Sequence, residues 1–222
     1  VVTLKDSIHD VGHEPDISRF LMGVYQITPS VPRYSKIWDV SKVLYRLEQW
    51  SPAKFLSLKL LSCKTAFLVL LASGQRVQTL HKLDTTLMQY SKQQVTFQFK
   101  DKLKHHRPGK DQETLVLDRY LDNPKLCPVN YIGHYLKRTN KLRTSDYLFV
   151  SLNKPHDHVS TDTLSRWIKF GLQKSGIDTE IYGSHSVRSA STSAAAKAGV
   201  PLQTIMQKAS WSNANTFHKM VL

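Results

Sequence analysis

One segment in the first half of the chain is apolar on almost every side. Between Ser57 and Gly74 the sequence reads SLKLLSCKTAFLVLLASG, with only two charged residues. Ser57 is a favourable N-cap, and Gly74 readily adopts the left-handed conformation that ends many helices. Because a helix without a polar face cannot lie on a protein surface, the sequence predicts that this helix is the buried centre of a domain.

The remaining patterns predict further helices and a few strands around this centre. Apolar residues recur with helical spacing over 40–47, 128–138 and 160–174, Ser184 caps a helix that runs to Gly199, and two short helices follow. Alternating apolar and polar residues predict strands over 95–99 and 114–117, with a possible third over 85–90. We therefore expect a mainly α (α+β) domain with one small antiparallel sheet.

A change of pattern divides the chain near residue 35. Residues 1–35 contain one short stretch with helical spacing, from Ile17 to Val24, and then the sequence TPSVPR. Two prolines remove backbone donors and favour extended geometry, which is typical of a linker. We expect residues 36–222 to form the main domain, and the chain to be a fragment of a longer protein.

The charge balance predicts a polyanionic partner. The chain has 31 Lys+Arg against 17 Asp+Glu, a net charge of +14, and such an excess favours binding to phosphates, although it can also serve solubility alone. The two cysteines are too few for a disulfide framework and lack zinc-site spacing. The longest wholly apolar run, residues 66–72, is too short to cross a bilayer, and the first residues lack the apolar stretch of a signal peptide. We expect an intracellular protein without a membrane partner.

Three basic motifs follow one another along the chain. Arg76 lies where the chain turns after the apolar helix. In HSVR, His185 and Arg188 share one face at the start of a helix, where free N–H groups and the helix dipole also favour an anion. Lys104 lies in the basic turn between two expected strands. Each motif is common on ordinary protein surfaces, so only their combination and order carry weight.

In the order Arg76, Lys104, His185 with Arg188, and then Trp211, the motifs resemble the catalytic domain of the tyrosine recombinase (phage-integrase-like) family. The resemblance covers residues 36–222 and is closest to the eukaryotic DIRS-like and Crypton-like mobile-element recombinases, whose place of action implies a nuclear protein. The marks of that branch are Ser73-Gly74-Gln75-Arg76, Lys104 with Arg107-Pro108-Gly109, and Trp211-Ser212 with Thr216-Phe217. The resemblance also implies that residues 1–35 are the C-terminal remnant of the family's core-binding domain and its linker.

The resemblance assigns roles in a metal-free phosphodiester strand transfer. Arg76 and Arg188 would hold the scissile phosphate, because bidentate guanidiniums stabilise the charge that develops on its oxygens. Lys104 would protonate the leaving 5′ oxygen, and His185 and Trp211 would hydrogen-bond the same phosphate. Further DNA contacts are expected from Lys100, Lys102, Arg107, Lys110 and Tyr182. The implied partners are duplex DNA and further copies of the chain on that DNA, with no metal and no small-molecule cofactor.

The family's attacking group, a tyrosine that forms a transient 3′-phosphotyrosine, is missing at its expected place. The aligned position is Val221, or Met220 with a shorter spacing. Neither side chain has a nucleophilic atom, and Tyr182 and His218 are poorly suited to replace it. We therefore expect site-specific recombination or integration to be impaired in this chain.

Other functions fit parts of the sequence. The strongest alternative is a non-catalytic DNA-binding domain, either a recombinase relic, a domesticated domain or an unrelated basic module. In such a domain Arg76, Lys104, His185 and Arg188 need not converge. A metal-dependent nuclease could use His105-His106 or His156-Asp157-His158, but no HExxH motif or paired carboxylates accompany them. A serine hydrolase is disfavoured because the sequence has no GxSxG motif.

Overall fold

The computed structural model describes residues 14–28, 34, 36–100 and 114–211. The chain divides into two compact units, Val1–Ser35 and Lys36–Leu222. In the first unit the described residues form one helix, α1 (Pro15–Ile27), which has no buried residue. Its proline stands at the start of the helix, where a missing backbone N–H costs nothing.

The apolar helix α3 (Leu58–Ser73) is the centre of the second unit, as the sequence predicts. The hydroxyl of Ser57 accepts a hydrogen bond from the backbone N–H of Leu60 at 3.3 Å, and Gly74 ends the helix with a φ of +61°. Most residues of α3 from Leu61 onward are buried. The helix packs against four other helices and one strand: α4 (Val77–His81), α5 (Pro128–Thr139), α6 (Thr161–Lys174), α7 (Ser186–Lys197) and β3 (Thr114–Asp118). The buried core of the unit therefore surrounds this one helix.

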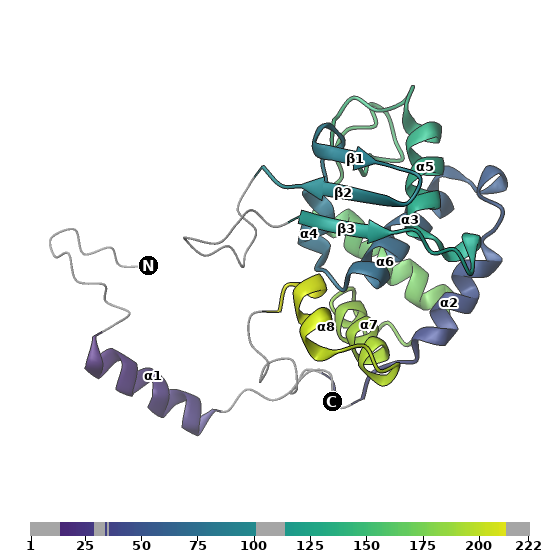
Figure 1. The fold of residues 1–222 in the computed structure, drawn as a ribbon. Coiled ribbons are helices and arrows are strands. Elements are labelled where there is room, and N and C mark those ends of the chain that lie inside the picture. Colours follow the sequence, from purple (N-terminus) through teal and green to yellow (C-terminus); the bar gives the residue numbers. More distant parts are fainter. Residues whose placement is uncertain (1–13, 29–33, 35, 101–113, 212–222) are drawn as a thin grey trace, which may run out of the picture. The chain divides into compact units, whose positions relative to one another are not determined.

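The second unit has further helices besides α3 among its described residues (Figure 1). They are α2 (Val40–Gln49), α4 (Val77–His81), α5 (Pro128–Thr139), α6 (Thr161–Lys174), α7 (Ser186–Lys197) and α8 (Leu202–Ala209). Short 3-10 turns, η2 (Ala53–Phe55), η3 (Thr85–Leu87) and η4 (Pro124–Leu126), join some of them to their neighbours. Local capping explains several starts: Asp39 accepts from the N–H of Ser41, and Ser160 accepts from the N–H of Thr163.

The sheet has three antiparallel strands in the order β1 (Met88–Tyr90), β2 (Gln94–Gln98) and β3 (Thr114–Asp118). In β2 and β3 every second residue is buried, and Val95 pairs with Leu117 in the register. The possible strand over 85–90 is present only in its second half. Asp84 accepts hydrogen bonds from the N–H and the hydroxyl of Thr86, which turns the first half into η3.

One capping prediction is wrong. The helix α7 begins with His185 at its N-cap position, in a right-handed helical conformation and without a side-chain cap bond. The hydroxyl of Ser184 instead donates to the hydroxyl of Ser165 on α6 at 3.2 Å. The chain already turns at this point, because the N–H of Ser186 donates to the carbonyl of Gly183. Of the two short helices expected at the end, the second falls outside the described residues.

The second unit is thus mainly helical with one small antiparallel sheet, as the sequence predicts. Figure 1 shows the sheet beside α3 and α5, and α7 and α8 next to each other. Among the described helices, none is long and apolar enough to cross a membrane.

Candidate active site

The guanidinium of Arg188 joins the ends of two helices. Arg188 lies in the first turn of α7 and is 7% exposed. Its Nη1 donates to the carbonyl of Gly74, which follows α3, at 2.8 Å, and to the carbonyl of Ala209, the last residue of α8, at 2.5 Å. These carbonyls belong to helix C-termini, where backbone acceptors have no partner within the helix. One nitrogen of the arginine therefore has a structural role.

The other edge of the same guanidinium has no hydrogen-bond partner among the described residues. Nε and Nη2 of Arg188 are buried and make no hydrogen bond to any residue in the described part of the chain. Because both N–H groups point from one edge of a planar guanidinium, they match two oxygens of a carboxylate or a phosphate. A buried charged donor pair is costly without an acceptor, so this edge suits an anionic ligand.

A second arginine acts on the first. Arg76 is half-buried at the N-cap position of α4, and burial lowers the pKa of its guanidinium. Burial, and then the positive charge of Arg76, lowers the pKa of Arg188 to about 9. At neutral pH both groups are still positively charged, so each disfavours the charge of the other. An anion bound between them would remove this repulsion.

The third member of the group is Trp211. The Cζ atom of Arg188 lies 4.2 Å from the centroid of a Trp211 ring, within the range of a cation–π contact. Trp211 lies one residue beyond the C-cap of α8, Ser210, and its backbone N–H donates to the carbonyl of Met206 at 2.8 Å. Its side chain packs against Ile205 of α8. The structure therefore brings Arg76, Arg188 and Trp211 to one place, and we call these three residues the arginine group.

His185 stands at the entrance to the same helix. It is exposed at the N-cap position of α7, three residues before Arg188. Residues with this spacing share one face of a helix, and the helix N-terminus favours negative charge. An anion at the open edge of Arg188 would therefore also lie near the N-terminus of α7, where His185 is exposed.

Comparison with known proteins decides the family. The model of the phage integrase family matches residues 54–219, which include Arg76, His185, Arg188 and Trp211. This chain belongs to the phage integrase family. No curated protein sequence matches the chain.

Several solved structures are similar to the chain of this phage integrase family member. XerA recombinase has 18% sequence identity and a TM-score of 0.62, and the match covers 89% of this chain and 62% of that chain. A lambda integrase dimer bound to a COC′ core site has 14% identity and a TM-score of 0.52, with 85% of this chain and 61% of that chain covered. The Tn1549 transposon integrase in complex with circular intermediate DNA has 11% identity and a TM-score of 0.58, with 92% of this chain and 71% of that chain covered. At these identities the likeness concerns the fold. The chain spans 62% of the XerA chain, so it corresponds to part of that protein.

The remaining predicted residues of this phage integrase domain are placed differently. Lys100, a predicted DNA contact, donates to the carboxylate of Asp84 at 2.8 Å, and this bond raises the pKa of Lys100. Tyr182 packs against the core and its hydroxyl donates to the carbonyl of Lys36 at 3.0 Å. The other predicted positions lie outside the described residues: Lys102, Lys104, Arg107, Lys110, Met220 and Val221.

The histidines that suggest a nuclease have structural contacts. His156 Nδ1 bonds to the carbonyl of Ser151 at 2.8 Å, and His158 Nε2 bonds to the carbonyl of His81 at 2.9 Å. The ring of His158 also stacks on Tyr147 with centroids 3.7 Å apart. No three His, Cys, Asp or Glu side chains form a group suited to a metal within the described ranges. His105 and His106 lie outside them.

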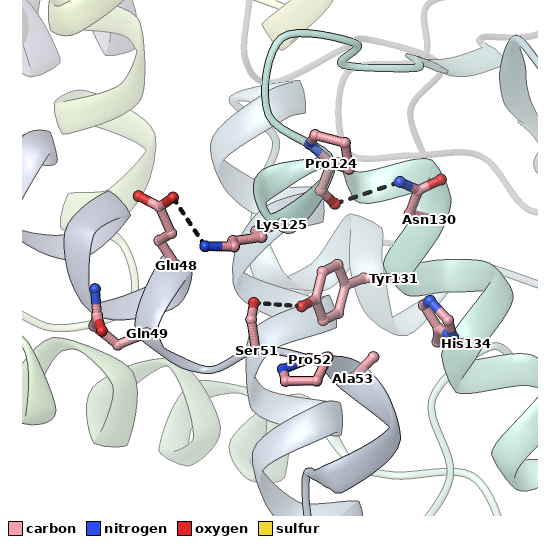
Figure 2. Close-up of a pocket in the computed structure, with 10 residues that line it drawn as sticks. All are labelled: Glu48, Gln49, Ser51, Pro52, Ala53, Pro124, Lys125, Asn130, Tyr131 and His134. Carbon is pink, nitrogen blue, oxygen red and sulfur yellow. Dashed lines mark hydrogen bonds and ion pairs between the residues drawn. The ribbon is translucent and has the colours of Figure 1, made fainter.

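A hollow of about 400 Å³ lies between the end of α2, η2, η4 and the start of α5. Figure 2 shows Glu48 paired with Lys125 at 3.7 Å on one side and the hydroxyls of Ser51 and Tyr131 bonded at 2.9 Å on the other. Its lining shares no residue with the arginine group. The mixture of charges, with no unsatisfied buried polar side chain among its lining residues, does not select a ligand class.

Sequence reasoning missed two buried contacts that hold the arginine group. Gln75, next to Arg76 in the sequence, bonds to the end of α8. Trp38 lies near the start of the second unit, and its indole N–H donates to the hydroxyl of Ser186 inside the HSVR motif. Both contacts join residues more than 130 positions apart in the sequence, so no local pattern indicates them.

Proposed function

We propose that residues 36–222 are the catalytic domain of a tyrosine recombinase that binds duplex DNA for site-specific recombination or integration. The observation that carries this proposal is the buried guanidinium of Arg188, which has two donors open on one edge and the charge of Arg76 nearby. That arrangement fits one scissile phosphate.

Each residue of the group has a task in this reaction. Arg76 and Arg188 hold the non-bridging oxygens of the phosphate, and Trp211 and His185 border it. In the family reaction a tyrosine oxygen loses its proton with the assistance of His185 and bonds to phosphorus, the bond to the 5′ oxygen breaks, and Lys104 supplies the proton that this oxygen takes up. The charge is stabilised by guanidinium groups, so the chemistry needs no metal or cofactor.

We infer that the reaction is impaired in this chain, because the positions aligned with the family's nucleophile carry no tyrosine. The sequence has Val221 at the aligned position and Met220 one residue earlier, and neither can attack phosphorus. A second function follows from the same fact: the domain binds DNA without cleaving it, as a relic or as a domesticated DNA-binding domain. In both functions the arginine group binds the DNA backbone.

The partners follow from the similar structures. A lambda integrase was solved as a dimer on its core site, and the Tn1549 integrase was solved with DNA. We infer that this chain acts on duplex DNA as one of several copies. The motif Ser73-Gly74-Gln75-Arg76 supports a place near the DIRS-like and Crypton-like elements, which act in the nucleus.

The first unit belongs to this proposal as the end of a core-binding domain. Its helix α1 exposes large apolar side chains, including Phe20, Leu21 and Ile27. Such a face suits a helix that packs within another domain.

A suicide substrate tests the proposal. Nicked duplexes that carry the sequences flanking the coding region are incubated without metal with the wild type, Val221→Tyr and Met220→Tyr, and separated on a denaturing gel. A covalent protein–DNA band in one tyrosine variant alone supports a recombinase site that has lost its nucleophile. Binding without any band supports the DNA-binding relic instead. If neither the wild type nor the variants bind duplex DNA, the proposal is overturned.

A further inference from the structure

The side chain of Gln75 makes three hydrogen bonds in the interior next to the arginine group. It is 5% exposed. Its Nε2 donates to the carbonyl of Lys208 at 3.0 Å and to the hydroxyl of Ser210 at 2.9 Å, and its Oε1 accepts from the hydroxyl of Thr79 at 3.3 Å. The amide is therefore fixed on the α4 side and reaches across to the last turn of α8.

The contact falls where α8 ends in an unusual conformation. Ser210 has φ 53° and ψ 50°, the left-handed region that a residue with a Cβ seldom adopts. Its conformation sets the direction in which the chain leaves α8, and the next residue is Trp211. A bond from Gln75 to the Ser210 hydroxyl therefore fixes the residue that aims the indole.

Gly74 and Gln75, which precede Arg76, both take part in the contact between the end of α3 and the end of α8. Gln75 bonds to the carbonyl of Lys208, and Arg188 bonds to the carbonyls of Ala209 and Gly74. The backbone approaches closely here, because a Cβ built on Gly74 would lie 2.9 Å from the Cβ of Ala209. The end of α8 and the turn before Arg76 are thus held as one piece.

We propose that Gln75 is a positioning residue, which acts through Ser210 to place Trp211 against the guanidinium of Arg188. The role of this placement in strand transfer rests on the proposed function. The placement itself does not, because it is argued from contacts within the chain.

The first experiment observes Trp211 directly. The protein is labelled with 5-fluorotryptophan, and its four tryptophan signals are recorded by ¹⁹F NMR, with Trp211→Phe identifying the signal of Trp211. Gln75→Met keeps the length of the side chain and removes both bonds to α8, so the Trp211 signal should shift or broaden. The matched control is Gln207→Met, an exposed glutamine on α8 itself, which should leave it unchanged.

A second variant protects the result against loss of folding. Ser210→Ala removes the hydroxyl that accepts from Gln75 and leaves the bond from Gln75 to the carbonyl of Lys208, so it should move the Trp211 signal in the same direction by a smaller amount. Circular dichroism shows whether each variant is folded. If Gln75→Met is folded and its Trp211 signal matches the wild type, the proposal is overturned.

The last experiment separates this inference from the proposed function. In the tyrosine-restored variant that forms an adduct, Gln75→Met should slow adduct formation at least ~10-fold at saturating DNA, as expected when a group that borders the reacting phosphate is misplaced. An unchanged rate with a shifted Trp211 signal would overturn the catalytic consequence and keep the placement. If no tyrosine variant forms an adduct, the function fails while the NMR result still decides on Gln75.

Discussion

The indole Nε1 of Trp38 donates a hydrogen bond to the hydroxyl of Ser186 at 2.8 Å, and both residues are buried. Ser186 lies between His185 and Arg188, and Trp38 is among the first residues of the second unit. The hydroxyl also donates to the carbonyl of Gly183 at 2.7 Å. The start of the second unit is therefore bonded to the turn that precedes the HSVR motif.

Trp38→Phe tests this contact. The phenyl ring keeps most of the packing but leaves the Ser186 hydroxyl without its donor, so stability should fall by about 1 kcal/mol. Urea unfolding measures the loss. A double-mutant cycle with Ser186→Ala should show that the two changes are not additive, since they remove one shared bond. Simple addition of the two effects would contradict a direct contact.

Arg188→Ala should affect both folding and DNA binding. The carbonyls of Gly74 and Ala209 lose a buried donor, which we expect to cost about 2 kcal/mol. Removal of one phosphate contact should weaken DNA binding and lower the salt slope of log K by about 1. Fluorescence anisotropy at several salt concentrations measures this slope. Arg166→Ala is the control, because Arg166 is exposed and, in the described part of the chain, bonds to Thr163 within its own helix.

Lys100→Gln should act through folding and leave the salt slope of DNA binding unchanged. Its ammonium is bonded to the buried carboxylate of Asp84. Burial alone would raise the pKa of Asp84, but hydrogen bonds from Lys100 and Thr86 hold it below its ordinary value. Loss of the lysine should therefore raise the pKa of Asp84 and lower the melting temperature slightly. A salt slope reduced by about 1 would show instead that Lys100 binds a phosphate.

Lys64 makes stability depend on pH. Its ammonium is buried in α3, donates to the carbonyl of Trp50 at 2.7 Å and to the hydroxyl of Ser51 at 3.1 Å, and lies 3.9 Å from the centroid of the Tyr131 ring. Burial lowers its pKa to about 7, against 10.5 for an exposed lysine. Below pH 7 the lysine is protonated in both the folded and the unfolded chain, so the full cost of burying the charge is present.

Between these two pKa values the unfolded chain holds a proton that the folded chain has lost, so stability rises with pH. Cys63, whose pKa burial raises to about 12 from 9.0, opposes this rise only above pH 9. Urea unfolding from pH 7 to 9 should show a gain of about 1 kcal/mol per pH unit. Lys64→Met should abolish the gain, whereas Lys59→Met, at an exposed position of the same helix, should retain it. A flat profile in the wild type would contradict a buried ammonium.

The parts of the fold that follow local rules could be predicted from the sequence. The cap at Ser57, the left-handed Gly74 and the alternation around Val95 each depend on neighbours in the chain. Ser184 shows the limit of such rules, since its hydroxyl found a partner on α6 and the helix began without it.

The site was predictable in the type of its residues and less in their contacts. Arg76, Arg188 and Trp211 do lie together, but Arg188 also supports the ends of α3 and α8, which no spacing reveals. Lys100 belongs to a basic run, and only the fold places the buried Asp84 beside it. Contacts between distant segments set these roles, because each depends on which backbone carbonyl or carboxylate the packing brings near.

The two roles of Arg188 have a consequence for how recombinase genes change when selection on strand transfer is lost. A copy released from selection can lose its tyrosine near the chain's end without harm to the bonds that Arg188 makes. Loss of Arg188 would strip two buried carbonyls of their donor. Genetic drift should therefore remove the tyrosine before it removes the arginine. A conserved arginine in a related sequence then indicates that the fold is still maintained, and does not by itself show that the enzyme is active.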